Sequence, residues 1–434
     1  MFFNESIERM GHDEMREIQI KKLRKEAAWA YANVPFYKER FDEVGMNPAQ
    51  ISSLEEWAQF PFTVKTDLRD HYPFGLFAVP KEKLARIHAS SGTTGKPTVV
   101  GYTKQDLENW SECMARLIVA AGGSSQDIVQ ISFGYGLFTG AFGLHYGMEK
   151  VGAAVVPMSS GNTEKQIMLM KDFGSTILIS TPSYALHMAE VMEEMGVTKD
   201  EISLRLGMFG AEGSTEEMRR ELEERWGILA TENYGLSEVM GPGVSGECYC
   251  KKGMHINEDH FLIEIVDPAT LEPVPDGQWG EVVITTLSKE ALPMLRYRTK
   301  DISRIITEEC ECGRKTRRME KIRGRSDDML IIRGVNVFPS QIESVLLNIN
   351  QVSPYYQLIV TRKGYMDLME VQVELADAAM LDQFQKLQAL EAEIRHKLRT
   401  ILGLDAKVRL VEPKSIERTT GKAKHVIDLR NGGN

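Results

Sequence analysis

The chain has 434 residues, which is too long for one ordinary core and predicts two or three packed units. Hydrophobic residues make up 42% and charged residues 26%, proportions typical of a globular protein. The net charge of −10 argues against a nucleic-acid or anionic-membrane partner, although a local basic patch can still bind a phosphate-rich molecule. No apolar run approaches the ~20 residues that span a bilayer. Residues 1–22 also lack the apolar core of a signal peptide, so we expect a cytoplasmic protein.

Hydrophobic patterning predicts an α/β architecture in the first half of the chain. A helix is expected from near Asp13, a good N-cap residue, to about Ala32, before Pro35. Short apolar runs then alternate with helical patterns. The predicted strands are residues 127–133, 153–158, 175–181 and 205–210, and the predicted helices between them are 163–173 and 183–195. This alternation predicts a parallel sheet covered by helices.

The pattern changes after about Gly246. Residues 260–267 and 280–287 predict strands separated by a proline-rich loop, which favours antiparallel β structure such as a small barrel. A second change falls at residues 324–328. Beyond it the chain predicts a strand (329–333), a helix (340–347), two strands around Gly364, a long helix (380–401) and a strand (407–412). That order fits a small α+β domain, so we place a large N-terminal domain at 1–326 and a C-terminal domain at 327–434.

Residues 90–97, Ser-Ser-Gly-Thr-Thr-Gly-Lys-Pro, are the strongest local signal. Glycines let the backbone approach a ligand, while hydroxyls, N–H groups and the side chain of Lys96 can surround phosphate oxygens. The segment is not a P-loop of the G-x-x-x-x-G-K-[ST] kind, because Ser90 stands where the first glycine would be and Pro97 follows the lysine. Pro97 also prevents a helix from running through the lysine. We predict a phosphate-binding loop; the alternative is an ordinary turn between strands.

Two later segments also carry glycine and charge. Residues 324–328, Gly-Arg-Ser-Asp-Asp, lie at the predicted domain boundary, where backbone rotation can move one domain over another. Residues 418–424, Arg-Thr-Thr-Gly-Lys-Ala-Lys, place Lys422 on a loop that can reach a phosphate or a carboxylate. The alternatives are a solvated turn and a basic tail segment.

Together, these segments resemble, in order and spacing, the acyl-adenylate-forming ligases, and within them the phenylacetate–CoA ligases. The resemblance covers essentially the whole chain. The resemblance is specific to the phenylacetate–CoA ligases at residues 133–140 (Phe-Gly-Tyr-Gly-Leu-Phe-Thr-Gly) and 333–339 (Arg-Gly-Val-Asn-Val-Phe-Pro). Further matches lie at residues 234–238, 287–293 and 297–301. The resemblance implies that ATP activates a carboxylic acid as an acyl-adenylate, with Mg²⁺ as cofactor, before transfer to CoA.

The resemblance implies roles for particular residues in the first half-reaction, whose transition state spreads negative charge over the phosphate. Lys422 matches the lysine that bridges the carboxylate and the α-phosphate, and Glu238 matches the carboxylate that positions Mg²⁺. Asp301 is expected to accept hydrogen bonds from the ribose, and Arg325 to contact the ribose or phosphate side. The other expected contacts are Ser91, Gly92, Thr93, Thr94 and Lys96 for the β- and γ-phosphates, and Gly210, Ala211, Glu212, Gly213 and Tyr234 for adenine. The alternative for Asp301 and Glu238 is a surface ion pair.

The resemblance also implies a second half-reaction, in which the CoA thiol attacks the acyl-adenylate. The mobile C-terminal domain is expected to swing about Asp327, which removes Lys422 and brings Arg333 and Gly334 toward the site. Gly334 would let the narrow pantetheine arm pass close to the backbone.

The acid pocket is expected to take a flat ring. Glycines beside aromatic side chains leave room for a ring and give it surfaces to pack against, which favours an aryl acid, phenylacetate above all, over an aliphatic one. A hydroxylated phenylacetate or an indole acid stays open, because one side-chain change can accommodate an added group. The expected lining residues are Tyr135, Gly136, Phe138 and Ala211.

The chain contains 5 cysteines, and four of them form two C-x-C pairs. Disulfides are not expected in a reducing compartment, and the pairing favours a metal. The available ligands are Cys248, Cys250, His255, Cys310 and Cys312, whereas zinc prefers four. Strand geometry does not decide between Cys248 and Cys250; we choose Cys248 with His255, Cys310 and Cys312. Four protein ligands without an open position predict a structural zinc; the alternative is reduced cysteines without a metal.

Three other functions fit parts of the pattern. An adenylating enzyme that acts on a carrier-protein thiol is disfavoured by residues 333–339 and by the lack of a visible carrier domain. A non-enzymatic, zinc-stabilised binding protein would not need Lys422, Asp301 and Glu238 together, and a kinase-like phosphotransferase does not fit the glycine loop. We expect a small aryl acid, ATP and CoA as partners, and neither nucleic acid nor membrane. A homodimer, common among soluble enzymes, is left open.

Overall fold

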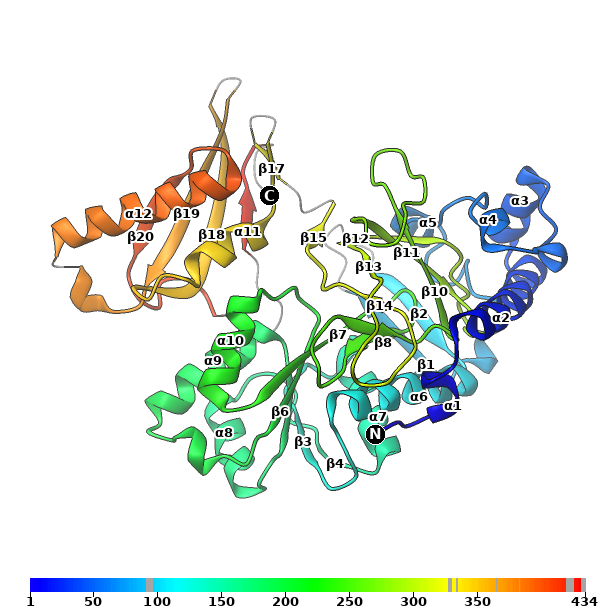
Figure 1. Cartoon of the computed structure of the whole chain (residues 1–434), viewed down its shortest axis with the longest axis horizontal. Helices are drawn as coiled ribbons and strands as arrows, with labels where there is room; N and C mark the ends of the chain where they lie inside the picture. The colour runs from blue at the N-terminus through cyan, green and yellow to red at the C-terminus, as the bar shows by residue number, and fades with distance from the viewer. Residues whose placement is uncertain are drawn as a thin grey trace.

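The computed structural model describes residues 1–90, 97–326, 330–332, 335–363, 366–381, 383–418 and 425–430. A large N-terminal part holds a nine-stranded and a four-stranded sheet, and a small α+β part follows it (Figure 1). The predicted fold class, α/β with an added α+β unit, is therefore confirmed. No helix among the described residues is long and apolar enough to cross a membrane.

Helices and a hairpin open the chain. The elements are α1 (Glu5–Glu8), α2 (His12–Asn33), α3 (Pro35–Val44), α4 (Leu54–Trp57), α5 (Lys65–Asp70), β1 (Arg86–Ser90) and β2 (Thr98–Tyr102). The prediction that Asp13 caps α2 was wrong, because Gly11 holds the N-cap position and Asp13 lies in the first turn. A carboxylate there still favours the positive end of the helix dipole.

The predicted β-α-β alternation forms the centre of the nine-stranded sheet. Its elements are α6 (Lys104–Ala121), β3 (Ile128–Ile131), α7 (Gly140–Val151), β4 (Ala154–Val156), α8 (Thr163–Asp172), β5 (Ile177–Ser180), α9 (Pro182–Glu194), β6 (Leu206–Phe209), α10 (Glu216–Trp226) and β7 (Leu229–Leu236). Strands β7-β6-β5-β3-β4 are neighbours in that order and all pair in parallel. β5 and β6 are buried along their whole length, as expected of parallel strands with both faces covered.

The sheet is mixed, which the prediction of a parallel sheet did not include. Beyond β7 it continues antiparallel through β8 (Gly241–Glu247), β9 (Met254–Ile256), β14 (Arg318–Met319) and β13 (Ile305–Ile306). The turn from β7 into β8 depends on a glycine, because a Cβ added to Gly235 would lie 1.9 Å from the carbonyl oxygen of Gly241. This close approach explains why position 235, within the predicted motif 234–238, is a glycine.

The predicted antiparallel β structure is confirmed as a four-stranded sheet. Its strands pair in the order β10 (Phe261–Val266), β11 (Gly280–Thr286), β12 (Tyr297–Ser303) and β15 (Gly324–Arg325), with β10 and β15 at the edges. The described strands thus form a sheet and not the small barrel that we expected. The pairing of β12 with β15 sets Asp301 opposite Arg325 in register.

The C-terminal part has its own hydrophobic core, separate from those of the N-terminal part. Its elements are β16 (Leu330–Ile332), β17 (Val335–Val337), α11 (Pro339–Leu346), β18 (Val352–Lys363), β19 (Met366–Leu375), α12 (Phe384–Leu402), β20 (Lys407–Val411) and β21 (Val426–Asp428). One sheet runs in the order β20-β19-β18-β21, and α12 buries Leu390, Ile394 and Leu398 at a four-residue spacing. A separate core is what an independent domain requires.

Candidate active site

Part of the predicted site lies outside the described residues, namely Ser91, Gly92, Thr93, Thr94, Lys96, Asp327, Arg333, Gly334 and Lys422. The strands that flank the first of these segments are described. β1 and β2 pair antiparallel up to Ser90 opposite Thr98, so residues 91–96 connect the two strands of a hairpin. A strand follows Lys96 where a P-loop would continue into a helix, in agreement with Pro97.

Three of the predicted nucleotide-binding residues meet in one hydrogen-bonded group. The hydroxyl of Tyr234 donates to Oδ2 of Asp301 at 2.6 Å, and Nη1 of Arg325 donates to Oδ1 at 3.0 Å. Burial, and then the charge of Asp301, raises the pKa of Tyr234 well above its ordinary value, so the phenol stays protonated and remains a donor. The carboxylate is thereby fixed from two sides, by β7 and by β15.

The predicted adenine segment is positioned by residues that the sequence reasoning missed. The side chain of Asn233 donates to the carbonyl of Phe209 at 2.8 Å and ties the end of β6 to β7. A Cβ on Gly210 would lie 2.7 Å from the carbonyl oxygen of Asn233, so a larger residue would push these strands apart. Glu212 accepts a hydrogen bond of 2.6 Å from the backbone N–H of Ser183, in the first turn of α9. The helix dipole favours a carboxylate at that end.

Ala211 and Gly213 complete that segment. Ala211 is exposed and has a left-handed backbone with φ of 70°, and Gly213 is also exposed. The segment between β6 and α10 thus presents its backbone at the end of the parallel strands. Ligands commonly bind in α/β sheets beyond the carboxyl ends of the strands.

Glu238 is buried, at 6% exposure, just beyond the end of β7. Nζ of Lys65, the first residue of α5, lies 3.7 Å from its Oε1. Burial, and then the charge of Glu238, raises the pKa of the neighbouring Tyr297. A buried carboxylate beside this half-exposed lysine can hold a hard cation, since such ions prefer oxygen ligands. No motif marked Lys65, and only the structure places it here.

The predicted acid-pocket segment lies beside the first strand of the hairpin. The backbone N–H of Ala89 donates to the carbonyl of Leu137 at 3.0 Å. Tyr135 packs edge-on against Phe142, and its hydroxyl forms a hydrogen bond of 3.0 Å with Nδ1 of His145. Phe138 is 54% exposed, so its ring is available for contact. Gly136 has φ of 133°, a conformation that favours glycine between these two aromatic residues.

Four predicted metal ligands come together. One ligand atom from each of Cys248, His255, Cys310 and Cys312 lies within 4.8 Å of all the others. Cys250 packs against the cluster but is not one of the four, so the structure brings together the set that we chose. His255 directs Nε2 at Cys312 (3.3 Å), and its Nδ1 lies 3.0 Å from the Thr316 hydroxyl. Such a second contact fixes the ring of a metal-binding histidine.

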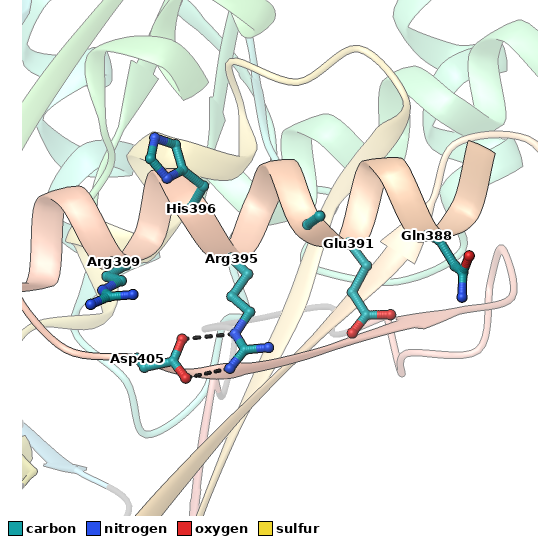
Figure 2. Close-up of a pocket in the computed structure, with 7 residues that line it drawn as sticks. Gln388, Glu391, Arg395, His396, Arg399 and Asp405 are labelled. Atoms are coloured by element: carbon teal, nitrogen blue, oxygen red, sulfur yellow. Dashed lines mark hydrogen bonds and ion pairs between the residues drawn. The ribbon is translucent and has the colours of Figure 1, made fainter. Parts of the chain in front are cut away.

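Among the described residues, three cavities lie away from the predicted nucleotide and acid sites. One hollow of about 400 Å³ runs along the outer face of α12 (Figure 2). It is lined mostly by polar side chains, which include the ion pair of Arg395 with Asp405. A second of about 780 Å³ lies between the start of α2 and β10, and a third of about 590 Å³ lies between α2 and α3. Cys310 borders the second, and none of the other predicted site residues that the structure describes lines any of the three.

Comparisons with known proteins agree with this geometry. A model of the AMP-binding enzyme family matches residues 38–288, and one of the AMP-binding enzyme C-terminal domain matches 334–430. The chain therefore belongs to the AMP-binding enzymes. It is 52% identical to the phenylacetate–coenzyme A ligase of Aromatoleum evansii, over 98% of this chain and 97% of that protein. It is 49% identical to the phenylacetate–coenzyme A ligase of Escherichia coli K12, over 98% of this chain and 97% of that protein. Within the AMP-binding enzymes it is a member of the phenylacetate–CoA ligase family, a family of acid–CoA ligases.

A solved relative also informs on the arrangement of the two parts. A 2-hydroxyisobutyryl-CoA ligase in the post-adenylation state superposes with a TM-score of 0.93 at 29% identity, over 98% of this chain and 92% of that one. The same enzyme in the thioesterification state superposes with a TM-score of 0.74 at 30% identity, over 99% of this chain and 93% of that one. Both structures are of one enzyme, so the chain superposes better on one state of that enzyme than on the other. The arrangement in this chain is closer to the post-adenylation state.

Proposed function

We propose that the protein joins phenylacetate to CoA at the expense of ATP. The carboxylate oxygen attacks the α-phosphorus, the bond to the leaving pyrophosphate breaks, and the CoA thiol then displaces AMP from the acyl carbon. The assignment of phenylacetate as the substrate rests on the sequence identity of 47–52% to four phenylacetate–CoA ligases over nearly the whole chain. The hydrogen bonds that join Tyr234, Asp301 and Arg325 support the assignment of these residues to the nucleotide site.

In the first half-reaction, the carboxylate of Asp301 accepts hydrogen bonds from the ribose hydroxyls. Its fixed position means that little reorganisation is needed when ATP binds. Gly210, Ala211, Glu212, Gly213 and Tyr234 frame the adenine, and Arg325 contacts the ribose or phosphate side. The residues that hold the β- and γ-phosphates are Ser91, Gly92, Thr93, Thr94 and Lys96.

The charges that develop at the phosphates are balanced from two parts of the chain. Glu238 would hold Mg²⁺, which when bound supplies positive charge to the phosphates. Its burial supports this role, because removing a carboxylate from water is costly unless a cation accompanies it, and Lys65 at 3.7 Å lies beyond hydrogen-bonding distance. Lys422 stabilises the transition state between the carboxylate and the α-phosphate.

In the second half-reaction, the C-terminal part swings about Asp327 and carries Lys422 away. Arg333 and Gly334 then border the path of the pantetheine arm. The similarity to two states of one solved ligase, at TM-scores of 0.93 and 0.74, supports two arrangements of the parts. The segments matched by the two family models, 38–288 and 334–430, are compatible with domains at 1–326 and 327–434.

The acid is held by Tyr135, Gly136, Phe138 and Ala211. The edge-on packing of Tyr135 on Phe142 and its bond to His145 hold this ring in one place. A flat aryl ring can pack on such a fixed aromatic surface, which favours phenylacetate over an aliphatic acid.

A structural zinc fits Cys248, His255, Cys310 and Cys312. Bond lengths of about 2.3 Å to sulfur and 2.0 Å to nitrogen place tetrahedral ligand atoms about 3.5 Å apart. The separations of 3.6 Å between Cys248 and Cys310 and 3.3 Å between Cys312 and His255 agree. Hydrogen bonding, first from Cys248, lowers the pKa of Cys312, whereas the bond to Cys312 raises the pKa of Cys248 and burial raises that of Cys310. A bound cation would favour the thiolate of all three. Such an ion would join β8, β9 and the segment between β13 and β14.

The proposal is tested by pyrophosphate release with ATP and Mg²⁺ across a panel of acids, each with and without CoA. The panel holds phenylacetate, 4-hydroxyphenylacetate, benzoate, indole-3-acetate and hexanoate. CoA-dependent turnover strongest with phenylacetate is expected. Turnover strongest with another aryl acid would replace the substrate and keep the mechanism, whereas a folded protein silent on every acid would contradict the proposal. A cytoplasmic location and a homodimer remain predictions.

A further inference from the structure

The segment that leads into Lys422 is held against the N-terminal part by acidic side chains of α9. Glu190 and Glu194 lie one turn apart on this helix, so they share a face. Glu194 pairs with Lys414, and Oε2 of Glu190 lies 3.8 Å from Nε of Arg418. The hydroxyl of Tyr355, on β18, also donates to Oε2 of Glu190 at 3.3 Å. Figure 1 shows α9 and α10 at the side of the N-terminal part that faces the C-terminal part.

Arg418 is fixed within its own part before it reaches Glu190. Its guanidinium makes two hydrogen bonds of 2.6 Å to the carboxylate of Glu374 on β19, and it lies 3.4 Å from the centre of the Tyr355 ring. Its side chain is only 16% exposed. Bidentate and stacked contacts orient an arginine closely. Glu190 therefore meets a preassembled pair, Arg418 and Tyr355, and not two independent surface groups.

The described residues on either side of 419–424, Arg418 and His425, contact neighbouring residues of one strand. Before the segment, Arg418 lies on Tyr355; after it, His425 stacks on Tyr356 with ring centres 4.3 Å apart and an angle of 9°. β21 then pairs in parallel with β18. Neighbouring residues of β18 thus hold Arg418 and His425, the described residues that precede and follow 419–424. Through Tyr355, one of these anchors is tied to α9.

We propose that Glu190 is a positioning residue for adenylation: it holds the C-terminal part in the arrangement that delivers Lys422. This rests on the proposed function. The contacts of Glu190 join side chains on two parts that change their relative position between half-reactions, so they belong to one arrangement only. The present arrangement superposes better on the post-adenylation state of a solved ligase than on its thioesterification state, with TM-scores of 0.93 and 0.74. Glu190 therefore favours the first half-reaction and contributes nothing to the second.

The test separates the half-reactions. Adenylation is measured as phenylacetate-dependent pyrophosphate release in a single turnover without CoA, and thioester formation is measured from supplied phenylacetyl-adenylate and CoA without ATP. Glu190→Ala is expected to slow adenylation about tenfold, since bonds to a charged group contribute on this scale, and to leave thioester formation equal or faster. Glu190→Gln keeps the Tyr355 bond and should fall between. Glu193→Gln is the matched control, because Glu193 pairs with Arg225 inside the N-terminal part.

A charge exchange tests the second pair without disturbing the fold. Glu194 and Lys414 are 54% and 69% exposed, so either can be replaced with little effect on stability. Glu194→Lys and Lys414→Glu should each slow adenylation about two- to threefold, and the double variant should restore it. An equal fall in both half-reactions would mark a structural role and overturn the proposal, as would unchanged adenylation in Glu190→Ala when the wild type is active.

A measurement without turnover keeps this distinct from the proposed function. Fluorophores introduced as unnatural amino acids at the exposed positions 172 and 386, one on each part, report their arrangement by energy transfer. Glu190→Ala should lower the population of the arrangement that the wild type prefers, whether or not any acid in the panel is activated. An unchanged distribution would overturn the positioning role even if the ligase activity is confirmed.

Discussion

Replacing Asp301 with asparagine tests the nucleotide site at its centre. Asp301 is 8% exposed, and its two oxygens accept from Tyr234 at 2.6 Å and from Arg325 at 3.0 Å. Asparagine keeps the volume, but it removes the charge and turns an N–H₂ group toward one of these donors. Both ribose hydroxyls would then meet a neutral and partly mismatched acceptor.

The magnitude follows from the burial of the site. A hydrogen bond to a charged group contributes about 1.5–3 kcal/mol. The pair with Arg325, whose side chain is 31% exposed, counts for less because solvent screens it. Loss of about 2–4 kcal/mol of transition-state stabilisation corresponds to a fall in kcat/KM for ATP of about 30- to 1000-fold.

The assay is pyrophosphate release at varied ATP and saturating acid, with melting temperature as the check on folding. Tyr234→Phe is the milder control: it removes one hydroxyl but keeps the charge of Asp301, and should cost about 1.5 kcal/mol, or about tenfold. A folded Asp301→Asn protein whose kcat/KM stayed within threefold of the wild type would refute the ribose assignment.

Three further outcomes are expected. Lys422→Ala should abolish adenylation but leave thioester formation from supplied acyl-adenylate largely intact; equal loss of both would refute the assigned role. Chelation should lower the melting temperature more than it lowers turnover at saturating Mg²⁺, and the reverse order would contradict a structural metal. Burial lowers the pKa of His260 from 6.5 to about 4, so the unfolded chain binds a proton first as the pH falls. Stability should therefore decrease from about pH 6.5 to pH 4, by up to about 3 kcal/mol. His260→Gln should flatten this part of the curve of unfolding free energy against pH, and an unchanged slope would contradict the reasoning.

The hydrophobic pattern of the sequence was enough to predict those helices and strands in which the buried residues follow the periodicity of the element itself. The helix expected at 163–173 is α8 (Thr163–Asp172), and the strand expected at 175–181 is β5 (Ile177–Ser180). β8 was missed because its sequence, Gly-Pro-Gly-Val-Ser-Gly-Glu, is rich in residues that strands disfavour. Its glycines let α6 approach closely: a Cβ on Gly243 would lie 3.0 Å from the sulfur of Met114. Tertiary packing, not local preference, makes this segment a strand.

The predicted site depended on resemblance more than on pattern. Tyr234 and Asp301 are 67 residues apart in the chain, and no local rule brings them to 2.6 Å. Lys65 and Asn233 carry no motif, so only the fold shows their places. For the cysteines, alternation along a strand could not separate Cys248 from Cys250. The structure does so because Cys248 directly follows β8 and is buried, whereas Cys250 is only partly buried and lies outside the group of four.

The placement of the site residues makes the half-reactions separable by mutation. Asp301 and its two donors belong to the N-terminal part, and adenosine is common to ATP and the acyl-adenylate. Asp301→Asn should therefore slow both half-reactions. Glu190 contacts the C-terminal part in a single arrangement, so its loss should slow only the first. Arg333 is expected at the site only after the swing, so Arg333→Ala should slow only the second. A ligase that kept one arrangement throughout would show no such division, because all three residues would act on the same bound state.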